Sequence, residues 1–172
     1  MASIETIPYK VLENDGFLQI RQYGPILLAS TKSNPNDSGF QAVFQYISGQ
    51  NQKQSKISMT SPVVTYLDNK EKITGFYVPS KYSKETVPRP TGDDVFINEL
   101  PPSTLAVVHF SGQMTNHLYQ KYHDILLDYI DSKGYQSIDN PLIMGYDPPY
   151  IDPAKKRNEI AYKVKRKDDD YE

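Results

Sequence analysis

The sequence predicts an α+β fold in which a strand–strand–helix–strand–strand unit occurs twice. The first unit contains an amphipathic helix with the three-to-four-residue spacing of a single apolar face. Its apolar residues are Phe40, Val43, Phe44 and Ile47. A second helical stripe lies between 115 and 133, and a pair of strands precedes and follows each helix. Two such units can pair as an antiparallel, partly closed barrel with one helix on each half.

Turn residues divide the first half into its elements. Asp15-Gly16 is a strong hairpin signal, and Gly24-Pro25 starts a second turn. The polar residues at 37–38 can cap the helix, and Gly49 can end it. Pro62 lacks a donor for the strand ladder, so it indicates a bulge or a sheet edge. The strands expected in this half are 9–13, 17–23, 26–31, 57–66 and 72–78.

The second half repeats this order of elements. A connector at 79–92, which contains three prolines, separates the halves, and Pro101-Pro102 supplies a turn. Gly134 is placed to end the second helix. The strands expected here are 95–100, 104–111, 142–146 and 159–164. The expected organisation is one domain over 1–164, with half-repeats at about 9–79 and 93–164, and a frayed charged tail at 165–172.

Composition excludes several classes of function. The chain of 172 residues has 19 basic and 21 acidic residues and a net charge of −2, so it lacks the basic excess of a general nucleic-acid binder. It has no cysteine, which excludes disulfides, iron–sulfur clusters, thiolate zinc sites and cysteine nucleophiles. We find no secretory signal and no apolar run of about 20 residues, and therefore expect a cytoplasmic protein without a membrane span.

The sequence contains no recognised catalytic or phosphate-binding motif. His109 is expected to be a half-exposed strand residue, His117 to be solvated, and His123 to pack beside the apolar stripe of its helix. The separation of His117 and His123 does not suit chelation of one metal ion from a helix face. We therefore favour a non-enzymatic role and expect no metal site.

Two segments have both a structural and a functional interpretation. In Met59-Thr60-Ser61-Pro62-Val63, the hydroxyls can satisfy backbone groups at a bulge, or Met59 can form an adaptable wall of a flat apolar pocket. Tyr146 lies in a proline-rich turn that precedes Lys155-Lys156-Arg157. This segment is either a solvated turn with an Arg157–Glu159 ion pair or a cationic rim for an acidic ligand. The structural interpretation is favoured for both segments, and Met59, Tyr146 and Arg157 are the candidate binding residues.

Five motifs in register carry a resemblance that runs from about 9 to 164. The motifs are Ile20-Arg21-Gln22-Tyr23-Gly24-Pro25, Tyr46-Ile47-Ser48-Gly49-Gln50-Asn51, Lys56-Ile57-Ser58-Met59-Thr60-Ser61-Pro62-Val63, Phe110-Ser111-Gly112, and Gly145-Tyr146-Asp147-Pro148-Pro149 with Arg157-Asn158-Glu159-Ile160 behind it. Through them the chain resembles the SOUL/haem-binding protein family. The resemblance implies a distorted antiparallel β-barrel flanked by two helices, with a pseudo-twofold repeat. The family is also similar in fold to small-molecule-binding domains of the gyrase-inhibitor type.

The resemblance further implies a ligand and a site. Several family members are described as binding haem or other tetrapyrroles in a shallow cleft beside the first helix. The matching apolar positions on this chain are Phe40, Phe44, Phe76 and Tyr146. Gln22 stands where one branch has a histidine proposed as axial ligand, and Asp37 aligns with a basic residue of another branch. An amide is a poor ligand for haem iron, so no axial ligand is identified, and binding would depend on apolar contact and the Lys155–Arg157 rim.

The leading hypothesis is non-enzymatic binding of haem, another tetrapyrrole or a similar planar amphipathic ligand in a helix–sheet cleft. Two alternatives stay open. One is a protein-interaction module that uses a helix or the groove without haem. The other is a small-molecule effector-binding or hydrolase-like domain of the gyrase-inhibitor type, for which Glu99 and Asp147 are the candidate acids.

Overall fold

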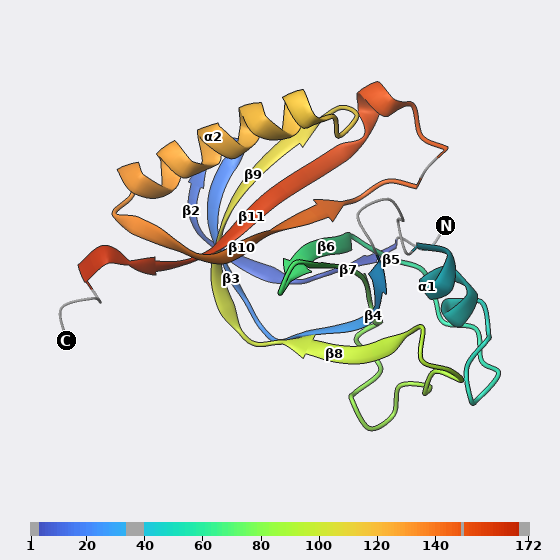
Figure 1. Ribbon diagram of the computed structural model, residues 1–172. Coiled ribbons are helices and arrows are strands. Elements are labelled where there is room, and N and C mark those ends of the chain that lie inside the picture. The colour runs from blue at the N-terminus through green and yellow to red at the C-terminus, as the bar shows by residue number, and fades with distance from the viewer. Residues whose placement is uncertain (1–3, 34–39, 149, 169–172) are drawn as a thin grey trace. The chain divides into compact units, whose positions relative to one another are not determined.

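Helices and strands follow one another along the chain in the predicted order, as the computed structural model in Figure 1 shows. It describes residues 4–33, 40–148 and 150–168. The helices are α1 (Phe40–Ile47), α2 (Asn116–Ser132) and a short 3₁₀ helix (Pro153–Lys155). The strands are β1 (Glu5–Thr6), β2 (Tyr9–Asp15), β3 (Leu18–Tyr23), β4 (Ile26–Ser33), β5 (Thr60–Ser61), β6 (Val63–Asp68), β7 (Glu71–Tyr77), β8 (Phe96–Leu100), β9 (Ser103–Ser111), β10 (Tyr135–Gly145) and β11 (Arg157–Arg166).

The elements divide into two compact units. The first unit comprises the described residues up to Ile7 together with Pro25–Pro101. The second unit comprises Pro8–Gly24 and the described residues from Pro102 onward. The chain therefore passes between units at three places, two of which are the predicted turns at Gly24-Pro25 and Pro101-Pro102.

The first unit has an antiparallel sheet in the order β6-β7-β4-β8 and a separate parallel pair, β1 with β5. α1 lies on one face of this sheet, where its Val43, Tyr46 and Ile47 side chains pack against β4 and β7. A helix of eight residues is not stable by itself in water, so this apolar packing holds it in place. Gly49 follows the helix at φ 120°, a backbone conformation that favours glycine.

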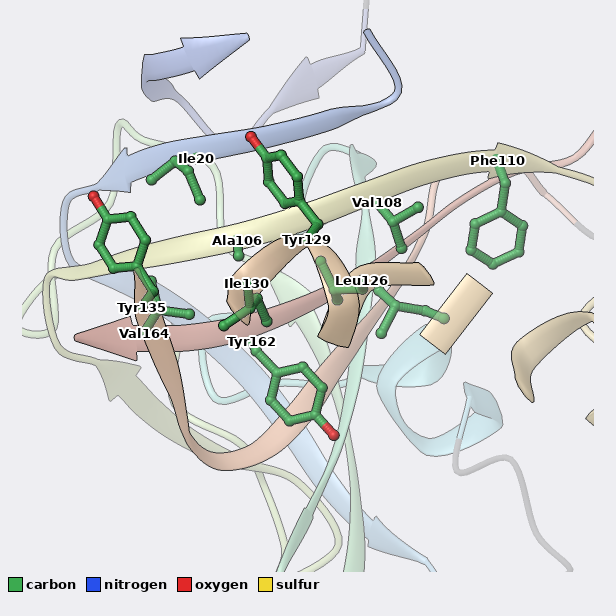
Figure 2. Close-up of a cluster of buried hydrophobic side chains, with 11 residues drawn as sticks. Ile20, Ala106, Val108, Phe110, Leu126, Tyr129, Ile130, Tyr135, Tyr162 and Val164 are labelled. Atoms are coloured by element: carbon green, nitrogen blue, oxygen red, sulfur yellow. The ribbon is translucent and has the colours of Figure 1, made fainter. Parts of the chain in front are cut away.

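The second unit has an antiparallel sheet in the order β2-β3-β9-β11-β10, and α2 lies along one face of it (Figure 1). Figure 2 shows Leu126 and Ile130 of α2 gathered against Ala106 and Val108 of β9 in the core of this unit. The side chain of Thr115 caps α2 by accepting a hydrogen bond from the Leu118 N–H at 3.1 Å. The predicted helix and its apolar face are therefore confirmed.

A strand–helix–strand–strand order occurs in both units. In the first unit the order is β4–α1–β6–β7, with the short β5 between α1 and β6. In the second unit the order is β9–α2–β10–β11. In each unit the strand before the helix pairs with the last strand, β4 with β7 and β9 with β11. The strand before the helix also pairs on its other side with a strand from outside this four-element order. That strand is β8 for β4 and β3 for β9. The predicted α+β fold with a repeated unit is thus confirmed.

The barrel is not confirmed, because the strands described in each unit form an open sheet. The two units also divide the chain differently from the half-repeats at 9–79 and 93–164, whose boundaries stay a prediction. The strand expected at 57–66 is interrupted at Pro62, which has a cis peptide bond to Ser61 and separates β5 from β6. The helix cap predicted at 37–38 lies outside the described residues. In the part of the chain that the structure describes, neither helix has the length and hydropathy that crossing a bilayer requires.

The last two strands are longer than the sequence predicts. β10 begins at Tyr135 instead of 142, and it pairs with β11 on both sides of a register shift between Ile138 and Leu142. The polar residues around this register shift interrupt the alternation of apolar and polar residues, so the sequence pattern does not predict the first part of β10. β11 extends to Arg166, into the segment predicted as a frayed tail.

Candidate functional site

The six predicted binding residues fall into both units. They are Phe40, Phe44, Met59 and Phe76 in the first unit, and Tyr146 and Arg157 in the second. Phe44 is 48% exposed and Met59 is 45% exposed. Phe76 is 2% exposed and belongs to the core beneath α1, so it supports the helix from within. Phe40 begins α1, but its side chain lies outside the part that the structure describes.

A small hollow lies beside α1, where the family resemblance places a cleft. Its volume is about 100 Å³, and it is lined by Ala42, Gln45 and Tyr46 of the helix together with residues of the 90–95 loop. Small-molecule pockets usually measure roughly 300–1,000 Å³. The hollow is therefore too small to enclose a tetrapyrrole, and the exposed Phe44 and Met59 offer a surface rather than an enclosing pocket.

A larger hollow of about 580 Å³ lies on the other face of the same sheet. Ala29 of β4 packs in the core on the α1 side, whereas Lys32 of β4 and Tyr66 of β6 line the hollow from the opposite side of the pleat. The charged residues of its lining are Lys32, Asp68, Asp93 and Asp94. Because acidic side chains outnumber basic ones there, the hollow disfavours a ligand with carboxylates, such as haem.

Hydrogen bonds connect the strands that form this larger hollow. Ser30 Oγ lies 2.7 Å from Asn98 Oδ1, and Asn98 Nδ2 donates to the Tyr66 hydroxyl at 3.1 Å. Gly75 lies against Ser30 and Leu28, and a Cβ atom added there would meet Ser30 Oγ at 2.9 Å. A glycine suits this position because any Cβ atom would crowd the side chains of Ser30 and Leu28 on the neighbouring strand.

The second unit contains a buried ion pair on the face of its sheet away from α2. Arg21 of β3 donates through Nη1 to Glu159 Oε1 at 2.9 Å and through Nη2 to Glu159 Oε2 at 2.7 Å. Both side chains are only 4% exposed. Their neighbours in sequence, Ile20 and Ile160, point to the opposite face and join the core beneath α2. Two parallel hydrogen bonds between ionised groups are the strong form of an arginine–carboxylate contact.

Glu159 of β11 has two further partners. The Tyr146 hydroxyl donates to Oε1 at 2.6 Å, and His109 Nδ1 lies 3.2 Å from Oε2. Burial raises the pKa of the Glu159 carboxyl, but hydrogen bonds from His109, Arg21 and Tyr146 outweigh burial and lower that pKa to about 2. Burial, followed by the charge of Glu159, raises the pKa of Tyr146 well above its ordinary value. Glu159 is therefore an ionised carboxylate that three side chains hold in place.

Two more donors of Arg21 are also engaged. Its Nε donates to Gln19 Oε1 at 2.8 Å, and its Nη1 donates to the Tyr23 hydroxyl at 3.0 Å. The Tyr9 ring lies 4.0 Å from the guanidinium carbon, which is the geometry of a cation–π contact, and Tyr9 is 42% exposed. A row of polar and aromatic side chains therefore crosses this face from β2 to β11.

This cluster corrects the predicted Arg157–Glu159 ion pair. Arg157 instead binds Asp147, with its Nη2 at 3.0 Å from Oδ1 and its Nε at 3.2 Å from Oδ2. The backbone brings Tyr146 and Arg157 together, because the Tyr146 N–H donates to the Arg157 carbonyl at 3.1 Å. Asp147 therefore neutralises the charge of Arg157, one of the three cations in the predicted Lys155–Arg157 rim.

The two carboxylates proposed for the enzymatic alternative also form ion pairs. Glu99 lies 3.1 Å from Lys84 Nζ. Hydrogen bonding to Arg157 lowers the pKa of Asp147, which is opposite to the raised pKa of a buried general acid. Among the residues that the structure describes, no group of three or more potential ligands could hold a metal ion.

Neither the burial of Arg21 nor its pairing with Glu159 was predicted from the sequence, where Glu159 was assigned to an ion pair with Arg157 on a solvated turn. A partial signal was present, because each charged residue adjoins an isoleucine within its strand, Ile20 beside Arg21 and Ile160 beside Glu159. A charge in such a position is buried only with a partner. The partner of Arg21 lies 138 residues away in the sequence, so the pairing required the fold.

Comparison with known proteins places the chain in a family. The model of the family described as SOUL heme-binding protein matches residues 4–163. Heme-binding protein 2 of Homo sapiens is 34% identical over an alignment of 127 residues that covers 64% of this chain and 62% of the human protein. Heme-binding protein 2 of Mus musculus is 33% identical over an alignment of 118 residues that covers 61% of this chain and 57% of the mouse protein. The matched segment thus spans less than two thirds of the length of each relative.

Solved structures share the fold at much lower identity. The EcmrR C-terminal domain superposes with a TM-score of 0.66 at 14% identity and covers 92% of this chain and 98% of its own. A hydrolase from Listeria innocua superposes with a TM-score of 0.59 at 9% identity and covers 90% of this chain and 94% of its own. These likenesses show a common fold and do not extend to function.

Proposed function

Because this chain belongs to the SOUL heme-binding protein family, we propose that it binds haem or another tetrapyrrole without converting it chemically. The observation that carries the proposal is the family match over residues 4–163, which includes both units. The two curated relatives described above are named for heme binding, and they align with more than half of the chain. A planar amphipathic ring also suits a protein that exposes aromatic side chains on its surface.

The proposed apolar contacts are Phe44 of α1 and Met59, which directly precedes β5, and both are close to half exposed. Covering one such side chain with an apolar ring is worth about 1.5–3 kcal/mol when burial is complete. Methionine adapts its shape to irregular partners, which suits a flat ligand on an open surface. No step of this proposal uses Phe76, whose ring is enclosed in the core.

Gln22 is not proposed as a ligand to haem iron. Its side-chain oxygen accepts a hydrogen bond from Thr104 Oγ1 at 2.8 Å, so the amide joins β3 to β9. An iron ligand would have to come from a more basic atom, such as an imidazole nitrogen. When haem is bound, the iron supplies the spectroscopic signal, and the protein supplies apolar contact and orientation.

The test is titration of the full chain with haemin, followed by its Soret absorbance. We expect a saturable change in wild type and binding about tenfold weaker in Phe44→Asp, because a carboxylate would replace an apolar contact. Gln41→Asp is the matched control, since it adds the same charge at another exposed position of α1 and should leave affinity unchanged. A response that does not saturate in wild type, or equal weakening by both substitutions, would contradict the proposal. Urea unfolding of each variant shows whether the fold is intact.

A further inference from the structure

The larger hollow of the first unit, with a volume of about 580 Å³, has an aromatic and apolar floor. Tyr66 of β6 is opposite Ile73 of β7 in the sheet, and Phe96 of β8 is opposite Ser30 of β4. Side chains at opposed positions of an antiparallel pair share one face. The two rings and Ile73 therefore form the floor of the hollow, and both rings are partly exposed. The volume lies within the range of small-molecule pockets, roughly 300–1,000 Å³.

Three carboxylates border this floor. Asp68 follows Tyr66 by two positions on β6, so its side chain points to the same face. Asp93 and Asp94 belong to the loop before β8 and also line the hollow. All three aspartates are exposed, and in the described part of the chain none of them forms an ion pair. Their negative charges are therefore available to a ligand.

The charge of the lining favours an organic cation over an anion or a metal ion. The cation among the described lining residues is Lys32, whose Nζ lies 3.6 Å from Glu71, a carboxylate outside the lining. The negative charges are thus in excess, and they attract a positive ligand. Over the residues with described side chains, no three acidic or histidine residues converge closely enough to hold a metal ion. An ammonium group requires no such cage, because its N–H groups can donate to separate oxygens.

The Tyr66 hydroxyl adds a polar group to the floor. It accepts a hydrogen bond from Asn98 Nδ2 at 3.1 Å, and Asn98 Oδ1 lies 2.7 Å from Ser30 Oγ. Burial raises the pKa of Tyr66, so the side chain stays a neutral phenol. A phenol both donates and accepts, and among the described residues no acceptor is found for its proton. The hydroxyl is therefore fixed in place by β8 and can still bind a ligand.

From these observations we propose that the hollow binds an amphipathic organic cation, namely an aromatic ring that carries an ammonium group. The ring lies on Tyr66, Phe96 and Ile73, and the ammonium group lies beside the three carboxylates. Aromatic rings stack on one another and attract cations over their faces. The site goes beyond the proposed function and is separate from Phe44, because α1 packs on the opposite face of the same sheet.

The experiment titrates the full chain against tryptamine and follows the fluorescence of the indole. The chain contains no tryptophan, so the indole signal comes from the ligand alone. N-acetyltryptamine has the same ring without the positive charge, and indole-3-propionic acid carries a negative charge instead. We expect saturable binding of tryptamine, weaker binding of the neutral compound and the weakest binding of the acid. Added sodium chloride should weaken the binding of tryptamine, because the carboxylates are exposed to screening.

Three variants locate the binding. Asp68→Asn and Asp93→Asn should each weaken tryptamine binding roughly fivefold, the effect of one unit charge at close range in water. Asp128→Asn is the matched control, since it removes the same charge from an exposed position of α2 in the second unit, and it should bind as wild type. Tryptamine binding no tighter than that of N-acetyltryptamine, or equal weakening by all three substitutions, would overturn the proposal. The haemin response of Asp68→Asn and Asp93→Asn should equal that of wild type, so each of the two proposed sites can fail without the other.

Discussion

Replacing Glu159 by glutamine is expected to destabilise the protein strongly, although the two side chains have nearly the same shape. The substitution removes the negative charge that Arg21 binds through two hydrogen bonds at 2.7 and 2.9 Å. Arg21 cannot lose its proton, and it is 4% exposed, so its charge would remain buried without a counterion. The glutamine amide would also point its own N–H₂ donor at Arg21 or Tyr146, whose hydrogen bonds the Glu159 carboxylate accepts.

The magnitude follows from the acidity of Glu159. Its pKa is about 2 in the folded protein against an ordinary 4.5, and at about 1.4 kcal/mol per pH unit the difference corresponds to about 3 kcal/mol of stability. Breaking a buried ion pair by removing one partner independently costs about 3–5 kcal/mol. For a chain of this length, a loss of 3 kcal/mol lowers the midpoint of thermal unfolding by about 6–12 °C.

The pH dependence has a definite sign. Because the folded-state pKa of Glu159 is depressed, its contribution is fully present above about pH 4.5 and is lost as the pH falls through the range from 4.5 toward 2. The destabilisation caused by Glu159→Gln should therefore be largest near neutral pH and should shrink toward pH 2.

The assay is urea unfolding of wild type and variant at pH 7 and at several acidic values, with the denaturant slope used to check for a two-state transition. Glu71→Gln is the control, because its partner Lys32 lies 3.6 Å away and both side chains are more than half exposed; its effect should stay below about 1 kcal/mol. An apolar double variant, Arg21→Met with Glu159→Leu, should be more stable than Glu159→Gln because it leaves no buried charge. If Glu159→Gln lost no more stability than Glu71→Gln, the role assigned to the buried pair would be wrong.

Two further substitutions test how the fold is held together. Gly75→Ala should cost about 1–3 kcal/mol, because the new Cβ would stand 2.9 Å from Ser30 Oγ, whereas Gly24→Ala meets no atom within 4 Å and should have a much smaller effect in the same urea assay. Thr115→Ala should cost about 1 kcal/mol by removing the cap of α2, and Thr115→Ser should recover most of it. A Thr115→Ala variant as stable as wild type would show that the cap is replaced by solvent.

Local patterns predicted the elements well where the relevant interactions are close in sequence. The apolar spacing of α1 and the glycine after it are properties of one short segment, and both were recovered in the structure. Pro62 was expected to interrupt a strand, and it separates β5 from β6. By contrast, β10 was found only in part, because its register shift places polar residues where alternation predicts apolar ones.

The candidate site could not be predicted to the same degree, because it depends on pairing between distant strands. The alternation of side chains along β3 places Arg21 and Ile20 on opposite faces, but it does not tell whether the face that carries Arg21 is solvated. That depends on β9 and β11, which bring His109 and Glu159 to the same face. Phe44 illustrates the reverse case, since its helical spacing predicts burial and yet it is close to half exposed.

Each compact unit contains a strand from the other half of the sequence, β3 in the second unit and β8 in the first, so neither half of the polypeptide carries a complete unit. Proteolytic nicking in the 79–92 connector would give an amino-terminal fragment without β8, which pairs with β4, and a carboxyl-terminal fragment without β3, which pairs with β9. Each fragment would expose an unpaired strand edge and tend to aggregate when alone. Mixed together, the fragments should recover their structure by complementation, because each carries the strand that the other lacks.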